Sequence, residues 1–131
     1  MSLKNNINNL KKNYSLGIIG GGQLALMLTE AAKNRGLKVC VQTKSSSDPA
    51  ALKADYVIEA DPLKMKGNKD LISKCEKIIF ENEWVKIDKL SLFGSENIFI
   101  PSLEAIKPLV DRFSQKKLID SLNIPCPKWI G

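Results

Sequence analysis

The stretch SLGIIGGGQLALML, residues 15–28, passes from a short apolar run through three glycines into a segment with helical spacing. Residues 16–19 are typical of a buried strand, and apolar residues recur at helical intervals over 23–34. Glycines at a strand-to-helix joint let the backbone turn sharply and expose the first amides of the helix. The joint therefore predicts an α/β unit with a candidate anion site.

Strand-like and helix-like segments alternate outward from this joint. Further strands are predicted at 37–41, 55–60, 77–82 and 97–100, and helices at 68–75, 87–93, after Ser102 and at 111–122. The strands are continuous apolar runs, which favours a parallel sheet covered on both faces. The predicted fold class is therefore α/β, a Rossmann-like parallel sheet with helices on both faces.

Helix ends and faces allow finer expectations. Gly36 stands where a glycine commonly ends a helix, and Asn68 and Ser102 are predicted N-caps. The inner face of the last helix is predicted to consist of Val110, Phe113, Leu118 and Leu122.

The glycine loop is the first candidate binding site. Gly20 can adopt the positive φ of the turn, and Gly22 has no Cβ to keep a phosphate from the backbone. Amides near Gln23 and Leu24 would donate to that phosphate, because they open a helix. One glycine would suffice for a turn, so the run that includes Gly21 favours anion binding.

The choice of nucleotide depends on the end of the second strand. Residues 41–44 contain no acid, whereas an NAD-binding domain uses one there to hold the ribose hydroxyls. Lys44 with Ser45–Ser47 could hold a 2′-phosphate, so an NADP-binding oxidoreductase domain is the alternative. No GK[ST] follows the glycines, which excludes a P-loop. A non-catalytic nucleotide-sensing module is a third hypothesis.

Two acids and one arginine complete the candidate site. Glu81 and Glu83 would lie at the rim beside the glycine loop if the preceding strand ends near Phe80. There they could hold an amine or a hydroxyl of a substrate. Arg112 stands near a helix N-terminus, which the helix dipole disfavours, so a phosphate contact would explain its placement.

Composition narrows the class of protein. The 131 residues suit one modest core, and the net charge of +6 comes from scattered lysines, which does not favour nucleic-acid binding. Three dispersed cysteines and the lack of histidine argue against a disulfide framework and a zinc site, and favour a reducing cytoplasm. No run is apolar enough to span a membrane, and residues 1–14 lack the apolar core of a signal peptide.

Four stretches together resemble the N-terminal region of the N5-carboxyaminoimidazole ribonucleotide synthetase family, within the ATP-grasp superfamily. They are LGIIGGGQLALMLTEAAKNRGLKV (16–39), IIFENEWV (78–85), IPSLEAI (100–106) and DRFSQKKLIDSLNIPCPKW (111–129). The resemblance implies a polar N-terminal arm at 1–14, a Rossmann-like pre-ATP-grasp domain at 15–110, and a helix with a proline-rich lead-in at 111–131.

The resemblance also implies a reaction. Aminoimidazole ribonucleotide, bicarbonate and ATP would give the N5-carboxyamino product, with Mg²⁺ on the ATP phosphates, as a step of purine biosynthesis. The resemblance implies that Gly20–Leu24 would meet the 5′-phosphate and that Arg112 would contact ATP. Glu81 and Glu83 match the two acids of a family stretch that usually reads Tyr-Glu-x-Glu-Asn. Here Phe80 stands in place of the tyrosine and Trp84 in place of the asparagine.

The family continues through a grasp domain that supplies the ATP clamp and the magnesium-binding acids, and none of that follows Gly131. The 131 residues alone are therefore expected not to turn over and not to bind a cofactor tightly. The resemblance leaves a homodimer open.

Overall fold

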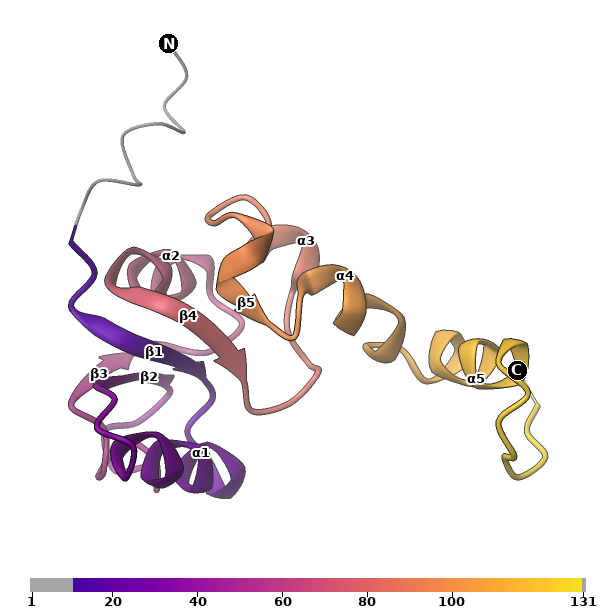
Figure 1. Ribbon diagram of the computed structural model, residues 1–131, viewed down its shortest axis with the longest axis horizontal. Helices are drawn as coiled ribbons and strands as arrows, with labels where there is room; N and C mark the ends of the chain where they lie inside the picture. The colour runs from indigo at the N-terminus through magenta and orange to yellow at the C-terminus, as the bar shows by residue number, and fades with distance from the viewer. Residues whose placement is uncertain (1–10, 131) are drawn as a thin grey trace, which may run out of the picture.

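Strand β1 (Tyr14–Ile19) lies at the centre of the protein because its neighbours pair with it on both sides (Figure 1). The structure is a computed structural model that describes residues 11–130. The other strands are β2 (Val39–Thr43), β3 (Tyr56–Glu59), β4 (Cys75–Phe80) and β5 (Phe99–Ile100). All pairings are parallel and the order is β3-β2-β1-β4-β5. The predicted fold class is confirmed.

Helices cover both faces of this sheet. Helix α1 (Gln23–Lys33) covers one face, where Ile18 and Val41 pack against its alanines. The opposite face carries α2 (Met65–Lys74), α3 (Ile87–Leu90) and α4 (Leu103–Ile106). Successive strand residues point to opposite faces, so both sides of a parallel strand must be apolar.

Several predicted boundaries are wrong by a few residues. Helix α2 begins at Met65 rather than at Asn68, and Asn68 is buried within it, where its amide donates to the Gln42 Oε1 atom at 2.9 Å. A tertiary hydrogen bond therefore replaces the predicted cap. Strand β4 begins two residues early and ends at Phe80, and β2 extends to Thr43.

The predicted helix ends at Gly36 and Ser102 are confirmed. Gly36 has a φ of +76°, and its N–H donates to the Lys33 carbonyl. Ser102 Oγ accepts from the Ala105 N–H at 3.2 Å and so caps α4. The helix that begins after Ser102 is α-helical only as far as Ile106. A 3₁₀ turn (Lys107–Leu109) that contains Pro108 then continues it.

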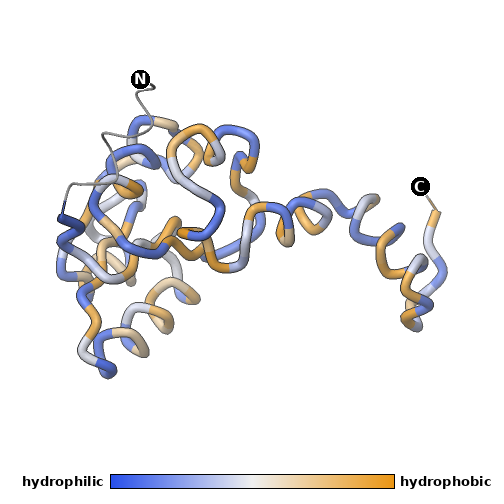
Figure 2. The backbone as a smooth tube through the Cα atoms, turned by 45° about the horizontal axis from the view of Figure 1, so that its top comes forward, coloured by the Kyte–Doolittle hydropathy of each residue, from blue (hydrophilic) through white to orange (hydrophobic). Residues whose placement is uncertain are grey.

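The last helix differs from its prediction. Helix α5 (Arg112–Ser121) projects away from the sheet (Figures 1 and 2) and has no buried residue. The expected inner face therefore packs on no core, and Phe113 instead meets Trp129 edge-to-face at 5.6 Å. Residues 1–10 of the predicted arm lie outside the described residues, and its last residue, Tyr14, belongs to β1.

No helix in residues 11–130 is long and apolar enough to cross a membrane.

Candidate functional site

A cavity of about 300 Å³ opens at the carboxyl ends of β1, β2 and β4. In open parallel sheets, ligands bind at this edge, beside the point where the strand order reverses. Here that point lies between β1 and β4, since the chain continues from β1 to β2 and β3 on one side and to β4 and β5 on the other. The cavity is lined by Ile19, Gly20, Gly21, Gly22, Thr43, Lys44, Asp48, Pro62, Glu81, Asn82, Trp84 and Val85.

The glycine loop forms one wall of this cavity. The Gly20 N–H donates to the Gln42 carbonyl at 2.9 Å, and the Gly21 carbonyl accepts from the Ala50 N–H at 3.0 Å. Gly20 has a φ of +124°, a backbone conformation that residues with a Cβ rarely adopt. The predicted positive φ is confirmed, and hydrogen bonds join the loop to β2 and to the turn at Ala50.

Glu81 fills the space that the glycines leave. Its N–H donates to the Ile19 carbonyl at 2.9 Å, which fixes it directly after β4. Its Oε2 accepts from the Gly22 N–H at 3.1 Å. A Cβ built on either Gly20 or Gly22 would collide with this carboxylate. The bare backbone thus admits an anion, and in this structure that anion belongs to the protein.

The start of α1 retains further donors. Gly22 is the N-cap and provides no side-chain cap, and the first turn contains no acid. Among the described residues, the N–H groups of Gln23 and Leu24 have no acceptor, and both side chains are exposed outside the cavity lining. Unpaired first-turn amides carry the positive end of the helix dipole and attract anions.

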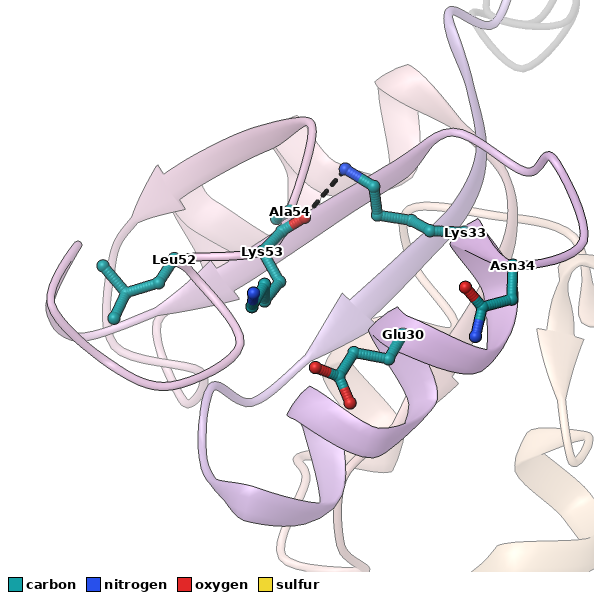
Figure 3. A pocket seen from close by; sticks show the side chains of 6 residues that line it. All are labelled: Glu30, Lys33, Asn34, Leu52, Lys53 and Ala54. Atoms are coloured by element: carbon teal, nitrogen blue, oxygen red, sulfur yellow. Dashed lines mark hydrogen bonds between the residues drawn. The ribbon is translucent and has the colours of Figure 1, made fainter.

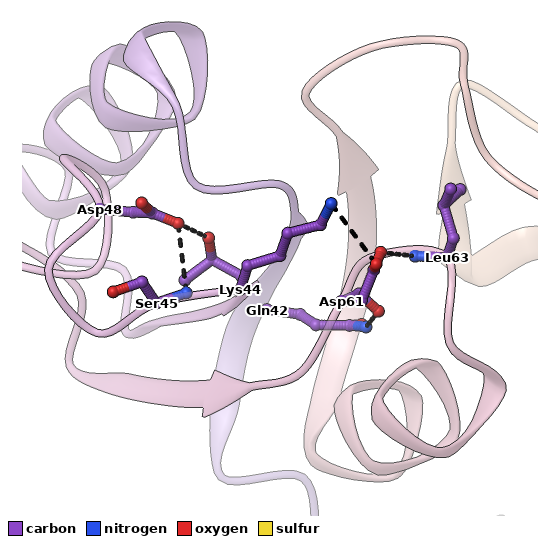
Figure 4. A network of polar contacts seen from close by, with 7 residues as sticks. Gln42, Lys44, Ser45, Asp48, Asp61 and Leu63 are labelled. Atoms are coloured by element: carbon purple, nitrogen blue, oxygen red, sulfur yellow. Dashed lines mark hydrogen bonds and ion pairs between the residues drawn. The ribbon is translucent and has the colours of Figure 1, made fainter.

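The second wall of the cavity comes from the end of β2 and the loop after it. Figure 4 shows the polar contacts that these residues make. Asp48 accepts hydrogen bonds from the Thr43 hydroxyl and, at 3.3 Å, from the Ser45 N–H. Lys44 forms an ion pair with Asp61 at 3.4 Å. The Leu63 N–H and then Lys44 hold the pKa of Asp61 below its usual value. Asp48 and Lys44 therefore line this wall, and the lysine already has a carboxylate partner just outside the lining.

Three of the groups predicted to hold a 2′-phosphate, namely the Lys44 ammonium and the N–H groups of Ser45 and Ser46, already have carboxylate partners. Lys44 is paired with Asp61, and the Ser46 N–H donates to Glu59 Oε2 at 2.9 Å. A 2′-phosphate would meet these carboxylates first, and like charges repel. The geometry does not favour the NADP alternative.

Two predicted site residues lie elsewhere. Glu83 is exposed on the turn after β4 and does not line the cavity. Arg112 lies on α5, where its guanidinium donates to Gln115 Oε1 at 3.0 Å. The structure thus brings Gly20–Gly22 together with Glu81, and it leaves Glu83 and Arg112 apart from them.

Sequence reasoning missed part of the lining. Thr43, Asp48, Asn82 and Trp84 all face the cavity, and the Trp84 N–H donates to Asn82 Oδ1 at 3.0 Å. Asn82 and Trp84 come just after the fourth strand. Their place at its carboxyl end could have identified them as candidate lining residues. Asp48 lies in a loop beyond β2 and had no such signal.

Magnesium has no ligand set in the described part of the chain. Residues 11–130 contain no group of three or more histidine, cysteine, aspartate or glutamate side chains that could hold a metal ion.

Comparisons with known proteins agree with this arrangement. A family model described as the ribonucleotide synthetase preATP-grasp domain matches residues 14–109. The N5-carboxyaminoimidazole ribonucleotide synthase of Synechocystis sp. is 40% identical over 116 residues, which cover 88% of this chain and 30% of that protein.

Solved structures give the same result. The N5-carboxyaminoimidazole ribonucleotide synthetase of Thermotoga maritima is 30% identical with a TM-score of 0.78, over 88% of this chain and 32% of that one. The Aspergillus clavatus N5-carboxyaminoimidazole synthase, in complex with ADP and 5-aminoimidazole ribonucleotide, is 27% identical with a TM-score of 0.78, over 89% of this chain and 31% of that one.

Proposed function

Because the chain belongs to the family of ribonucleotide synthetase preATP-grasp domains, we propose that it is the substrate-side domain of an ATP-dependent ligase. The proposed reaction is the carboxylation of aminoimidazole ribonucleotide to its N5-carboxyamino form. The chain spans 30% of the length of the Synechocystis relative, so this reaction is proposed for an enzyme of which such a domain is one part. The division at residues 15–110 and 111–131 is part of the same proposal.

The observation that carries the proposal is the placement of Glu81 against the glycine loop. Its Oε2 is occupied by the Gly22 N–H, whereas no described residue donates a hydrogen bond to Oε1. A half-buried carboxylate with a free oxygen accepts hydrogen bonds from hydroxyl or amine groups, and such charged bonds are strong. We infer that Glu81 binds a ribose hydroxyl or the amine of the ribonucleotide.

The phosphate of the same ligand needs a different position. Glu81 already occupies the Gly22 amide, so a phosphate there would face a carboxylate. The amides of Gln23 and Leu24 are the donors left at the start of α1. We propose that they receive the 5′-phosphate, while Gly20 and Gly21 shape the wall beside it.

ATP is proposed to bind elsewhere. Relatives have been solved with ATP or ADP. The resemblance of residues 111–129 to the family implies that Arg112 contacts ATP, and we propose this contact for the chain. The position of Arg112 on the projecting helix α5 suits a contact outside the cavity. Glu83 is exposed and lies outside the cavity lining, so it is not part of the proposed substrate site.

Thermal-shift titration tests the proposal, because a ligand that binds the folded state raises the melting temperature with the logarithm of its concentration. Aminoimidazole ribonucleotide and ribose 5-phosphate should stabilise the protein, and NADP should not. Glu81→Gln keeps the shape of the side chain but removes its charge. This substitution should weaken the affinity for aminoimidazole ribonucleotide by about 10- to 100-fold, because a hydrogen bond to a charged group is lost.

Glu83→Gln is the matched control and should leave the titration unchanged. Stabilisation by NADP alone would support the oxidoreductase alternative. No response to any of the three ligands would contradict the proposal and favour a module that recognises another molecule.

A further inference from the structure

Trp84 is the most exposed aromatic side chain in residues 11–130, and it belongs to the lining of the cavity at the glycine loop. Its side chain is 72% exposed. The other aromatic rings in this part of the chain have packing partners, since six of them form three pairs and Phe93 packs against the core. Ligand cavities are commonly lined by aromatic side chains. The one ring without a packing partner thus lies where a ligand would reach it.

The backbone around Trp84 is held by local contacts. The Trp84 N–H donates to Asn82 Oδ1 at 3.0 Å, and the Val85 N–H donates to the Glu83 carbonyl at 2.8 Å. The next side chain, Val85, is buried in the core. The indole is therefore anchored at its Cα and turns about two side-chain torsions, so ordering it on a ligand costs little conformational entropy.

Trp84 differs in chemistry from the other groups that line the cavity. Glu81, Asp48 and Lys44 offer charge, and the glycine loop offers bare backbone. These groups recognise hydroxyls, amines and other polar atoms of a ligand. Trp84 is the one aromatic residue in the lining, and the face of an indole stacks on flat heterocycles. The cavity therefore has one surface suited to a planar ring.

A larger hollow, of about 530 Å³, lacks such a surface. It lies between α1 and the turn at residues 50–54, and Lys33 bridges its two sides by donating from Nζ to the Lys53 carbonyl at 2.9 Å (Figure 3). Glu30 and Lys53 bring charge to it and Leu52 an aliphatic side chain, but none of the described residues that line it is aromatic. Volume alone thus does not locate a site for a planar ring.

We propose that Trp84 stacks on the imidazole ring of the bound ribonucleotide. This inference rests on the proposed function, because it concerns the same cavity and the same ligand. There Glu81 contacts a ribose hydroxyl or the amine, and the first amides of α1 contact the phosphate. Neither contact uses the face of the base. Trp84 is then the residue that makes the site prefer a ribonucleotide over a sugar phosphate that has no base.

Isothermal titration calorimetry with two ligands tests this preference. Trp84→Ala should weaken the affinity for aminoimidazole ribonucleotide by about 10-fold, the usual scale for loss of one stacked aromatic, and should leave that for ribose 5-phosphate unchanged. Trp84→Phe keeps an aromatic face and should retain most of the affinity. Trp84 is exposed, so circular dichroism melts should show that both variants fold.

Trp129 is the matched control, because the chain contains only these two tryptophans. Trp129 meets Phe113 edge-to-face, donates to Asp120 Oδ2 at 3.1 Å and lies outside the cavity lining. Trp129→Phe should leave both affinities unchanged, and it makes Trp84 the sole reporter of indole fluorescence. Aminoimidazole ribonucleotide should quench that emission to saturation, whereas ribose 5-phosphate should bind with a much smaller change.

The two ligands also separate this inference from the proposed function. If both ligands bind the unaltered chain and Trp84→Ala weakens neither, the proposed function stands and the stacking is wrong. Equal weakening of both ligands would likewise overturn it, because Trp84 would then shape the cavity instead of contacting the base. If neither ligand binds the unaltered chain, the proposed function and the stacking are both wrong.

Discussion

Helices α2 and α5 are both ten residues long, yet different interactions hold them. Helix α2 buries Leu71 and Ile72 against the sheet and has no side-chain N-cap. Helix α5 buries nothing, and Asp111 caps it by accepting from the N–H groups of Phe113 and Ser114. A helix this short is marginal in water by propensity alone, so each needs a second source of stability. Tertiary packing supplies it to α2 and local hydrogen bonds supply it to α5.

The largest difference should appear when a leucine is truncated in each region. Leu71→Ala removes a fully buried side chain and should lower the free energy of unfolding by about 2–5 kcal/mol. Leu122→Ala, just after α5, should change it by about 0.5 kcal/mol or less, because that side chain is 59% exposed. Urea unfolding followed by circular dichroism measures both. Equal losses would show that α5 shares a core with the sheet.

Removal of a polar side chain should also destabilise the protein more in α2 than in α5. Asn68→Ala leaves the buried Gln42 Oε1 without its donor and also removes the bond from the Asn68 amide to the Pro62 carbonyl. The expected loss is about 1–3 kcal/mol, the cost of an unsatisfied buried group. The control in α5 is Gln115→Ala, whose partner Arg112 is exposed and regains water. An Asn68→Ala melt identical to that of the unaltered chain would contradict the tertiary role of this amide.

Substitution of the N-cap residue should instead have the larger effect in α5 and the smaller effect in α2. Asp111→Ala should remove hydrogen-exchange protection from the amides of α5 and leave the global unfolding midpoint unchanged, since α5 is not part of the core. Lys64→Ala, at the N-cap of α2, should change neither, because Lys64 forms no side-chain cap bond. Loss of protection in the sheet of the Asp111 variant would mean that the two regions unfold together.

The smallest effect should be a difference in pH dependence. Hydrogen bonds from Ser114 and Phe113 lower the pKa of Asp111 in the folded chain. Its contribution is therefore fully present above the unfolded pKa, about 3.9, and is lost as the pH falls through the lower folded value. Amide shifts of Ser114, followed by NMR during acidification, should move in that range. They should not move in Asp111→Asn, and identical curves for both proteins would exclude the cap as the cause.

The sequence predicts the regular parts of this fold well, because apolar periodicity depends only on neighbouring residues. The predicted helix at 23–34 and the strand at 16–19 agree closely with α1 and β1. The start of α2 was predicted wrongly because Asn68, a good capping residue, serves a partner in β2 instead. Local preference gave way to a contact that only the folded sheet creates.

The candidate site was predictable only in part. The glycine loop is continuous in sequence, so its turn and its positive φ could be inferred. The contact between Gly22 and Glu81 joins residues 59 positions apart and depends on the register that aligns Ile19 with Phe80. A pattern read along the chain does not contain that register, and so the loop appeared open to a phosphate.

The same contact constrains the order in which the protein can become competent to bind. Glu81 reaches the loop only after β4 has paired with β1, since its own amide is anchored to the Ile19 carbonyl. A nascent chain that has formed β1, α1 and β2 would present bare amides without the carboxylate beside them. Recognition of a hydroxyl or amine through Glu81 is thus a late event of folding, and its appearance would report that the central pair of strands has closed.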